Sequence, residues 1–225
     1  MKFVDQTSVA PAIKERWLAS FADRVSIPTY RRDQLSTGVV HLGVGNFHRA
    51  HQAVYFDQLA ELGLTQWGVT GLSFRSRTVR DALSAQDHLF TVVEQDGHRS
   101  TARIVGSMLN YVHAPSDPSQ ALTALTSERT RLVTLTLTGD GYPVDASGDL
   151  VMSDDVAHDL DRTCWPQTAF GYLTDALARR HRAGGHPLTV LSCDNLPNSG
   201  QRARASVLAM AERRHPGLAD GSRRR

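Results

Sequence analysis

The stretch "VVHLGVGNFHRAHQAVYFDQL", Val39 to Leu59, decides the fold. A short apolar, β-branched run ends at Gly43, and a helical pattern begins near Phe47, so the stretch predicts a strand, a glycine turn and a helix. The turn nearly matches the Gly-x-Gly-x-x-Gly fingerprint of dinucleotide-binding folds, but His48 stands where the third glycine is usual. That difference predicts a helix packed slightly further from its sheet.

Candidate strands and helices alternate along the rest of the chain. Apolar runs predict strands at 67–72, 132–137 and 186–195, and a turn at Asp96 and Gly97 predicts an antiparallel hairpin. Because the strands are Val/Leu runs without alternation, they indicate a parallel sheet covered on both faces. We therefore expect an α/β fold, a doubly wound and mostly parallel Rossmann-like sheet with a small antiparallel insertion.

The helices follow from periodicity and from stop signals. They are predicted at 47–62, 75–86, 119–127, 166–184 and 199–215. In the first of them, one face is expected to point inward, formed by Phe47, Ala50, Val54, Leu59 and Leu62. The acidic segment 143–161 is interpreted as a surface excursion. The expected organisation is a lead-in segment at 1–37, a dinucleotide-binding domain at 38–213 and a frayed tail at 214–225.

Composition excludes several function classes. The chain has 225 residues and a net charge of only +2, which gives no case for a nucleic-acid-binding protein. No segment reaches the apolar length of a membrane span, and the N-terminus has no run of signal-peptide type, so we expect a soluble, cytoplasmic protein. Cys164 and Cys193 form no CxxC pair and predict reduced thiols. His48 and His51 are three apart on a helix but lack further ligands, so no metal site is expected.

The glycine turn has the composition of a phosphate site. Gly43 suits a tight turn, Gly45 lets the backbone approach a pyrophosphate, and Arg49 in the first helical turn adds positive charge. The alternative is a plain βα turn whose glycines serve only steric needs. The predicted cofactor-binding residues are Leu42, Gly43, Val44, Gly45, Asn46, Phe47, His48, Arg49, Ser73 and Arg75.

The end of the second strand bears on the choice of cofactor. NAD sites usually place a carboxylate there for the adenosine ribose, whereas this chain has Ser73 followed by Arg75 and Arg77. An arginine there can accommodate a 2′-phosphate, so NAD is expected and NADP is not excluded. The alternative is that these arginines only begin a solvated helix.

The opening stretch closely resembles the N-terminal domain of the mannitol dehydrogenase family, the long-chain polyol dehydrogenases. The pieces "WGVTGLSFRS", "VRDALSAQDHLFTVV", "LVTLTLTGDGY" and "LSCDNLPNSG" agree with that family in the same order, from about Ser36 to about Glu212. The resemblance implies a nicotinamide cofactor, no metal, and hydride transfer between a polyol or sugar-acid alcohol and its ketone, as for mannitol and fructose or mannonate and fructuronate. Two departures are "TGDGY" at 138–142, where the family usually has "TEKGY", and the missing acidic residue near Ser73.

The resemblance also implies catalytic roles. Asn195 matches a family asparagine that helps to stabilise the developing alkoxide, although Asp194, Asn195 and Asn198 could instead cap the last helix. The family takes its general acid/base lysine from a "KxxxxNxxH" segment of a helical C-terminal domain. That segment does not occur in these 225 residues, whose only lysines are Lys2 and Lys14. We therefore expect the chain to be incomplete for catalysis alone, as a fragment, a shortened gene product or half of a split enzyme.

Two rival functions remain at this point. One is a non-catalytic dinucleotide-binding module that acts through a partner chain, in which an apolar surface left by the absent domain promotes association. The other is a methyltransferase with a sulfonium cofactor, which usually has an acidic residue ahead of the glycine turn. His41 and Leu42 occupy that place, so this reading ranks below the others.

Overall fold

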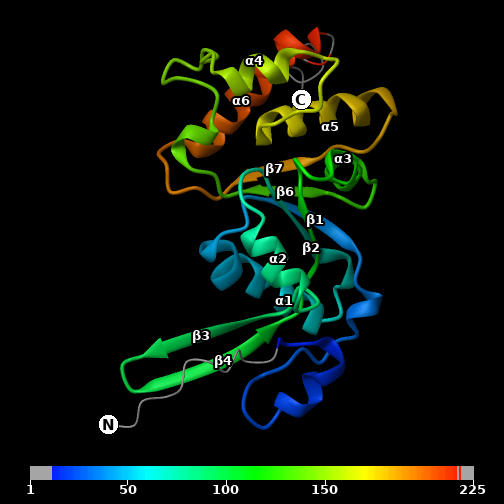
Figure 1. The fold of residues 1–225 in the computed structure, drawn as a ribbon, viewed down its shortest axis with the longest axis vertical. Helices are drawn as coiled ribbons and strands as arrows, with labels where there is room; N and C mark the ends of the chain where they lie inside the picture. Colours follow the sequence, from blue (N-terminus) through cyan, green and yellow to red (C-terminus); the bar gives the residue numbers. More distant parts are fainter. Residues whose placement is uncertain (1–11, 217, 219–225) are drawn as a thin grey trace.

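A computed structural model describes residues 12–216 and 218 (Figure 1). Its centre is a five-stranded sheet in which all neighbouring strands run parallel. In sheet order the strands are β5 (Met108–His113), β2 (Gly68–Ser73), β1 (Thr37–Leu42), β6 (Leu132–Leu135) and β7 (Thr189–Ser192). The chain thus adds β2 and β5 on one side of β1, crosses back, and adds β6 and β7 on the other side. This is the strand order of a doubly wound Rossmann-like sheet, as predicted.

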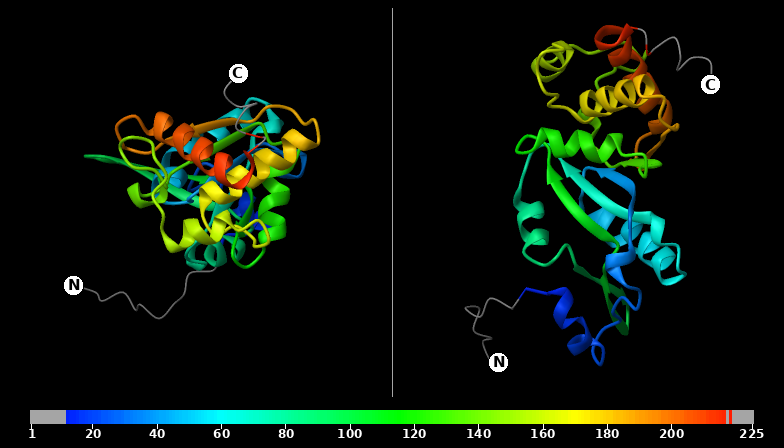
Figure 2. Two further views of the ribbon diagram at one scale, coloured as in Figure 1. Left: turned by 90° about the horizontal axis from the view of Figure 1, so that it is seen from above. Right: turned by 90° about the vertical axis from the view of Figure 1, so that its right-hand side faces the viewer.

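Helices cover both faces of this sheet (Figures 1 and 2). The α-helices are α1 (Ala53–Glu61), α2 (Thr78–Ser84), α3 (Pro118–Thr126), α4 (Asp154–Leu160), α5 (Ala169–Arg182) and α6 (Ser199–Arg214). Shorter helical turns are η1 (Glu15–Phe21), η2 (Arg32–Gln34), η3 (His48–Gln52), η4 (Thr65–Trp67) and η5 (Gly139–Gly141).

Two apolar cores lie on opposite faces of the sheet. The larger core joins Val40 and Leu42 of β1 to side chains of α3, α5 and α6, including Phe170 and Met210. The smaller core joins Val44, which follows β1, to α1, α2 and β5. Val40 and Leu42 are two residues apart on β1 and point to the same face, while the smaller core begins at Val44, just after the strand. The chain on either side of Gly43 is thus held by one core on each face of the sheet.

The antiparallel insertion is a hairpin of β3 (Phe90–Asp96) and β4 (Arg99–Val105), which extends away from the main sheet (Figure 1). The lead-in segment pairs with it, since the backbone N–H of Ser26 donates to Ala102 at 3.0 Å and Ile104 donates back to Ser26 at 2.8 Å. Residues 1–11 of that segment lie outside the described part of the chain.

Two strands differ from the sequence prediction. β5 was not predicted, because Asn110 interrupts its apolar run and only the sheet context makes it a strand. The run around β7 was predicted to be buried, but β7 is an edge strand, and the side chain of Leu191 is 48% exposed. An edge strand lacks a neighbour on one side, so an apolar composition does not guarantee burial.

Segment 143–161 is also more ordered than predicted. It contains α4, whose residues Val156 and Asp159 are buried, so it is not simply a surface excursion. Ser153 caps this helix by accepting the backbone N–H of Val156 at 3.3 Å. At the other end of the chain, Arg214 still belongs to α6 and is buried, whereas 217 and 219–225 of the predicted tail lie outside the described residues.

The helix after the glycine turn buries only part of the predicted face, of which Val54 packs against the smaller core. Phe47 is 50% exposed and Leu62 is 76% exposed, while the buried residues are His48, Ala53, Asp57 and Ala60. The spacing of five between the first two of these reflects η3, which is a single π-helical turn. This wider turn rotates the following helix, so an inward face counted at 3.6 residues per turn is wrong.

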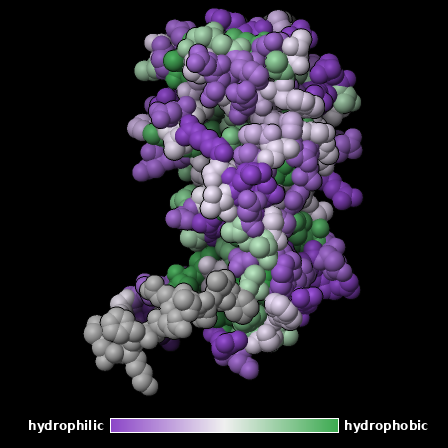
Figure 3. Space-filling view, viewed as in Figure 1, coloured by the Kyte–Doolittle hydropathy of each residue, from purple (hydrophilic) through white to green (hydrophobic). Residues whose placement is uncertain are grey.

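On the face shown in Figure 3, hydrophilic residues predominate and apolar residues are scattered among them in small groups. No helix among the described residues is long and apolar enough to cross a membrane.

Candidate functional site

The site lies where the strand order reverses, between β1 and β6. Gly43 follows β1 with φ +94°, a conformation that favours glycine, and a Cβ there would lie 2.2 Å from the carbonyl oxygen of Thr136. Thr136 follows β6, and its hydroxyl donates to the carbonyl oxygen of Gly43 at 2.7 Å. The two strand ends are thus held in direct contact at the point where ligands of such sheets bind.

Two histidines support this junction from one side. The imidazole of His41 on β1 lies 2.7 Å from the hydroxyl of Thr134 and 2.9 Å from that of Thr136. His48 in η3 stacks on it, with ring centroids 3.7 Å apart. The ring of His48 thus packs face to face between η3 and β1. The greater distance between helix and sheet that the sequence predicted stays a prediction.

Both imidazoles are buried and neutral. Burial holds the pKa of His41 well below its usual range, and the neighbouring His48 adds to this effect. Burial likewise lowers the pKa of His48 to about 4, although a hydrogen bond with Gln52 opposes it. The base of the turn is therefore an uncharged, packed platform at neutral pH.

A cavity of about 1010 Å³ opens over the carboxyl ends of the strands. This volume is at the upper limit of the roughly 300–1,000 Å³ typical of ligand pockets. It extends from the glycine turn to the loop after β2 on one side and to the segment that joins α4 to α5 on the other. Its lining includes Gly43, Ser73, Arg75, Thr136, Tyr142 and Trp165.

The predicted turn residues fall into two groups. Gly43 and Val44 line the cavity, and Leu42 packs into the larger core and presents only its backbone at the junction. Gly45 is exposed, and a Cβ there would meet only the carbonyl oxygen of Gly43, at 3.8 Å. Gly45 thus leaves open space above the turn, the arrangement that a closely approaching phosphate needs.

The remaining turn residues do not line the cavity. Asn46 accepts a hydrogen bond from the guanidinium of Arg49 at 2.5 Å. Phe47 lies on the surface, 5.2 Å from the ring of His51, which in turn meets Tyr55 at 5.0 Å. His51 and the buried His48 therefore diverge, and no group of three or more potential metal ligands occurs within the described residues.

The loop after β2 forms one wall of the cavity. Ser73 and Arg75 both line it, next to Tyr111 of β5. Burial raises the pKa of the Tyr111 hydroxyl, and nearby Ser73 and Arg49 oppose that shift. Arg49 therefore acts electrostatically on a residue of the cavity, although it does not line the cavity itself.

Asn195 lies just after β7, in a loop that is anchored through its neighbour. The hydroxyl of Tyr142 donates to the carboxylate of Asp194 and lies 2.7 Å from the hydroxyl of Ser192. Tyr142 lines the cavity, whereas Asp194 and Asn195 are not among the residues that line it. The residue before α6 is Asn198, which makes no side-chain cap, so the predicted capping role is wrong for it.

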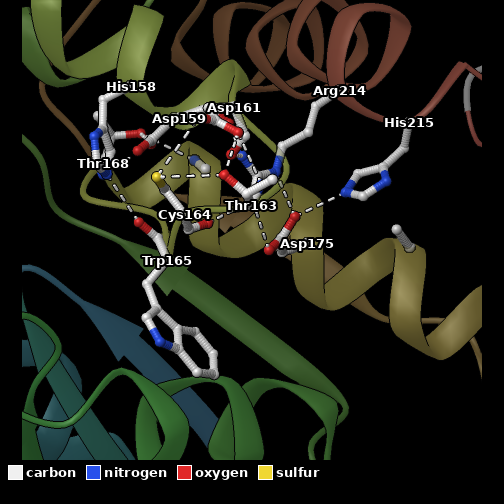
Figure 4. Close-up of polar contacts among 12 residues, drawn as sticks. His158, Asp159, Asp161, Thr163, Cys164, Trp165, Thr168, Asp175, Arg214 and His215 are labelled. Carbon is white, nitrogen blue, oxygen red and sulfur yellow. Dashed lines mark hydrogen bonds and ion pairs between the residues drawn. The ribbon is translucent and has the colours of Figure 1, made fainter.

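Sequence reasoning missed a buried ionic cluster next to the segment that joins α4 to α5, which forms the second wall of the cavity (Figure 4). The guanidinium of Arg214 binds both carboxylate oxygens of Asp175, at 2.6 and 3.1 Å, and His215 contacts the same carboxylate at 2.7 Å. Burial alone would raise the pKa of Asp175, but these hydrogen bonds outweigh burial and lower it. No sequence signal could pair residues 39 positions apart on α5 and α6.

Arg214 also holds the segment that forms this wall. Its guanidinium donates to the backbone carbonyls of Asp159, Asp161 and Cys164, the last two at 2.7 and 3.1 Å. Cys164 and Trp165 line the cavity. One arginine therefore links α5 and α6 to the backbone of the cavity wall.

Comparison with known proteins agrees with this architecture. Residues 37–220 match the mannitol dehydrogenase Rossmann domain. The chain is 45% identical to a mannitol 2-dehydrogenase of Cereibacter sphaeroides, over 84% of this chain and 40% of that protein. It is 40% identical to one of Phaeosphaeria nodorum, over 87% of this chain and 35% of that protein.

A solved structure of a mannitol 2-dehydrogenase also resembles this chain. The mannitol 2-dehydrogenase of Pseudomonas fluorescens, in a ternary complex with NAD and D-mannitol, superposes with a TM-score of 0.89 and 36% identity, over 95% of this chain and 44% of that one. The chain thus spans less than half the length of the relatives it matches. Because the match to the mannitol dehydrogenase Rossmann domain covers residues 37–220, most of the sequence, the chain belongs to the mannitol dehydrogenase family.

Proposed function

We propose that this chain is the NAD-binding part of a polyol or sugar-acid dehydrogenase. The observation that carries the proposal is the glycine turn at the junction of β1 and β6, which opens into a cavity of about 1010 Å³. The pyrophosphate lies against Gly43 and Gly45, where a missing Cβ leaves open space. The mannitol 2-dehydrogenase with bound NAD supports the choice of cofactor.

The proposed reaction is hydride transfer between a secondary alcohol and a ketone, of the mannitol–fructose or mannonate–fructuronate type. When bound, the nicotinamide supplies or accepts the hydride. Asn195 is proposed to donate its amide N–H to the developing alkoxide, because the neighbouring Asp194 is hydrogen-bonded to Tyr142, which lines the cavity. Of the other turn residues proposed for the cofactor, Val44 lines the cavity, whereas Leu42, Asn46, Phe47, His48 and Arg49 do not line it and are proposed to shape the turn.

A general base for this reaction is proposed to come from outside the chain. Lys14, the one lysine among the described residues, pairs with Asp87 at 3.0 Å and does not line the cavity. Without a positioned base, the rate should fall on the order of 10²–10⁴-fold for that contribution alone. The chain is therefore proposed to bind the cofactor but to turn over polyols poorly by itself.

Titration of the purified chain with NADH and with NADPH tests the binding proposal. We expect saturable cofactor fluorescence and a rise in the unfolding temperature, because ligand that binds only the native state stabilises it. No response to either cofactor would refute the proposal. Incompleteness is tested separately with mannitol and mannonate as substrates, and turnover within tenfold of a full-length family enzyme would contradict it.

A further inference from the structure

We propose that the adenosine end of this site is built for a ribose 2′-phosphate, so that the chain binds NADPH at least as tightly as NADH. The proposal rests on the proposed function and concerns the loop after β2. In NAD-selective sites, a carboxylate at the end of the second strand accepts the ribose hydroxyls and repels a 2′-phosphate. The corresponding residue here is Ser73, which is neutral and lines the cavity.

The charged residues of the loop after β2 are all basic. The segment from Ser73 to Arg80 contains three arginines and no acidic residue. Arg80 pairs with Asp81 at 3.0 Å, whereas Arg75 and Arg77 form no ion pair within the described residues. Arg75 is exposed and lines the cavity, so its guanidinium is available to a phosphate.

The carboxylates of the cavity lie elsewhere. Asp140 lines it from η5 and Asp155 from α4, not from the loop after β2. On the loop after β5 the acidic residue is Asp117, which caps α3 by accepting the backbone N–H of Gln120 at 2.9 Å and does not line the cavity. Neither the loop after β2 nor that after β5 therefore brings a negative charge to the cavity that would exclude a 2′-phosphate.

The loop is also held in place before any ligand arrives. The carbonyl of Ser73 accepts the backbone N–H of Ala114 at 2.9 Å, and the ring of His113 lies 3.3 Å from the carbonyl of Arg75. The backbone is thus fixed while the guanidinium of Arg75 stays free to turn. Beside it, Val79, Pro115 and Pro118 give the cavity apolar walls against which a flat base can pack. A fixed backbone reduces the entropy lost on binding.

The first measurement is a pair of titrations, NADH and NADPH, at the same ionic strength. The proposal requires that the Kd for NADPH is equal to or below that for NADH, and a lower Kd for NADH would overturn it. Binding of NADPH should also weaken more steeply with added salt, because the extra phosphate meets an exposed, screened charge. If neither cofactor binds, both the proposed function and this inference fail. If NADH binds more tightly than NADPH, only this inference fails.

The second measurement assigns the effect to Arg75. The variant Arg75→Gln removes the charge but keeps a hydrogen-bonding side chain, and it should raise the Kd for NADPH on the order of ten- to a hundredfold. The Kd for NADH should change less than about threefold, since no phosphate of NADH lies at this position. The matched control is Arg129→Gln, an exposed arginine in the loop before β6, which should leave both values unchanged.

Fragments identify the group that is recognised. Competition by 2′,5′-ADP should be stronger than competition by ADP in the parent chain, and this difference should disappear in the Arg75→Gln variant. Equal competition by both fragments in the parent chain would overturn the assignment of a 2′-phosphate site. Thermal unfolding of each variant verifies that the protein titrated is folded.

Discussion

His41 and His48 stack ring upon ring, with centroids 3.7 Å apart and planes inclined by 13°. Their contact joins the first strand to the helix after the glycine turn. In the usual fingerprint a third glycine permits that approach, whereas here two flat neutral rings fill the space. The lowered pKa values of both imidazoles predict that the stability of the site depends on pH.

We expect acid to destabilise the fold through these two imidazoles. Their pKa values are lowered in the folded state, to about 4 for His48, while the unfolded chain binds protons below about pH 6.5. The stabilisation is therefore complete above pH 6.5 and is lost as the pH falls toward 4. Each imidazole should contribute a slope of up to about 1.4 kcal/mol per pH unit.

Denaturant unfolding at several pH values between 4 and 7 measures this slope. The variant His48→Gln should flatten it by up to the contribution of one proton, even if its stability at pH 7 is lower. His51→Gln, on the exposed side of the same turn, serves as the control and should keep the parent slope. An unchanged slope in His48→Gln would show that the stack does not control the acid response.

The two glycines of the turn should fail in different ways. Gly43→Ala should destabilise the fold, because the new Cβ would meet the carbonyl of Thr136 at 2.2 Å in a backbone conformation with positive φ. Gly45→Ala should unfold at nearly the parent temperature, because its Cβ enters open space. It should nevertheless weaken dinucleotide binding at least tenfold, since the methyl occupies the approach of the phosphates.

Thermal unfolding and cofactor titration on both variants separate these effects. A Gly45→Ala chain that binds NADH and NADPH as well as the parent would place the pyrophosphate elsewhere. Full stability of Gly43→Ala would mean that the junction of β1 and β6 can relax.

Removal of Arg214 should be strongly destabilising. The Arg214→Ala variant leaves the buried Asp175 carboxylate without its main partner and frees backbone carbonyls of the cavity wall, so we expect a loss of about 3–5 kcal/mol in the free energy of unfolding. Denaturant unfolding provides the measurement. As the control, Arg31→Ala breaks the exposed pair with Asp33 and should leave stability unchanged. Equal stability of both variants would show that the ionic cluster of Arg214 and Asp175 does not stabilise the fold.

Tyr142 should anchor the loop of Asn195. Its hydroxyl has a raised pKa because burial and the carboxylate of Asp194 disfavour the phenolate, so it remains a hydrogen-bond donor at neutral pH. The Tyr142→Phe variant should lose about 1.5–3 kcal/mol of stability, the usual contribution of a hydrogen bond to a charged group. The control is Tyr55→Phe at an exposed tyrosine, and chemical denaturation compares the two. If the two variants unfold alike, the contact with Asp194 is not a significant anchor.

The sequence was most informative where local chemistry determines structure. The run before Gly43, the hairpin turn at Gly97 and the helix ending near Gly184 were all readable, because turn residues and periodicity act over a few positions. β5 and the exposure of β7 depend on sheet neighbours, and the inward face of α1 depends on one π turn. None of these has a local signal.

The same distinction between local and long-range information applies to the site. The glycine turn and the uncharged end of β2 were predictable from short motifs, and Gly43, Val44, Ser73 and Arg75 do line one cavity. The partners that hold the cavity in shape were not predictable. His41 meets Thr134, Tyr142 meets Asp194 and Asp175 meets Arg214, across 93, 52 and 39 residues respectively. Contacts of such separation arise only from topology.

That separation has a consequence for the order of folding. During synthesis β1 can pair with β2 early, but the hydroxyls that complete the surroundings of His41 come from Thr134 of β6 and from Thr136 just after it, 93 and 95 residues later. Closing so long a loop has an entropic cost that must be met before the contact forms. The ligand-binding junction should therefore be among the last parts of the sheet to assemble, and until β6 arrives, the central strand has an unpaired edge that a chaperone or another nascent chain can occupy.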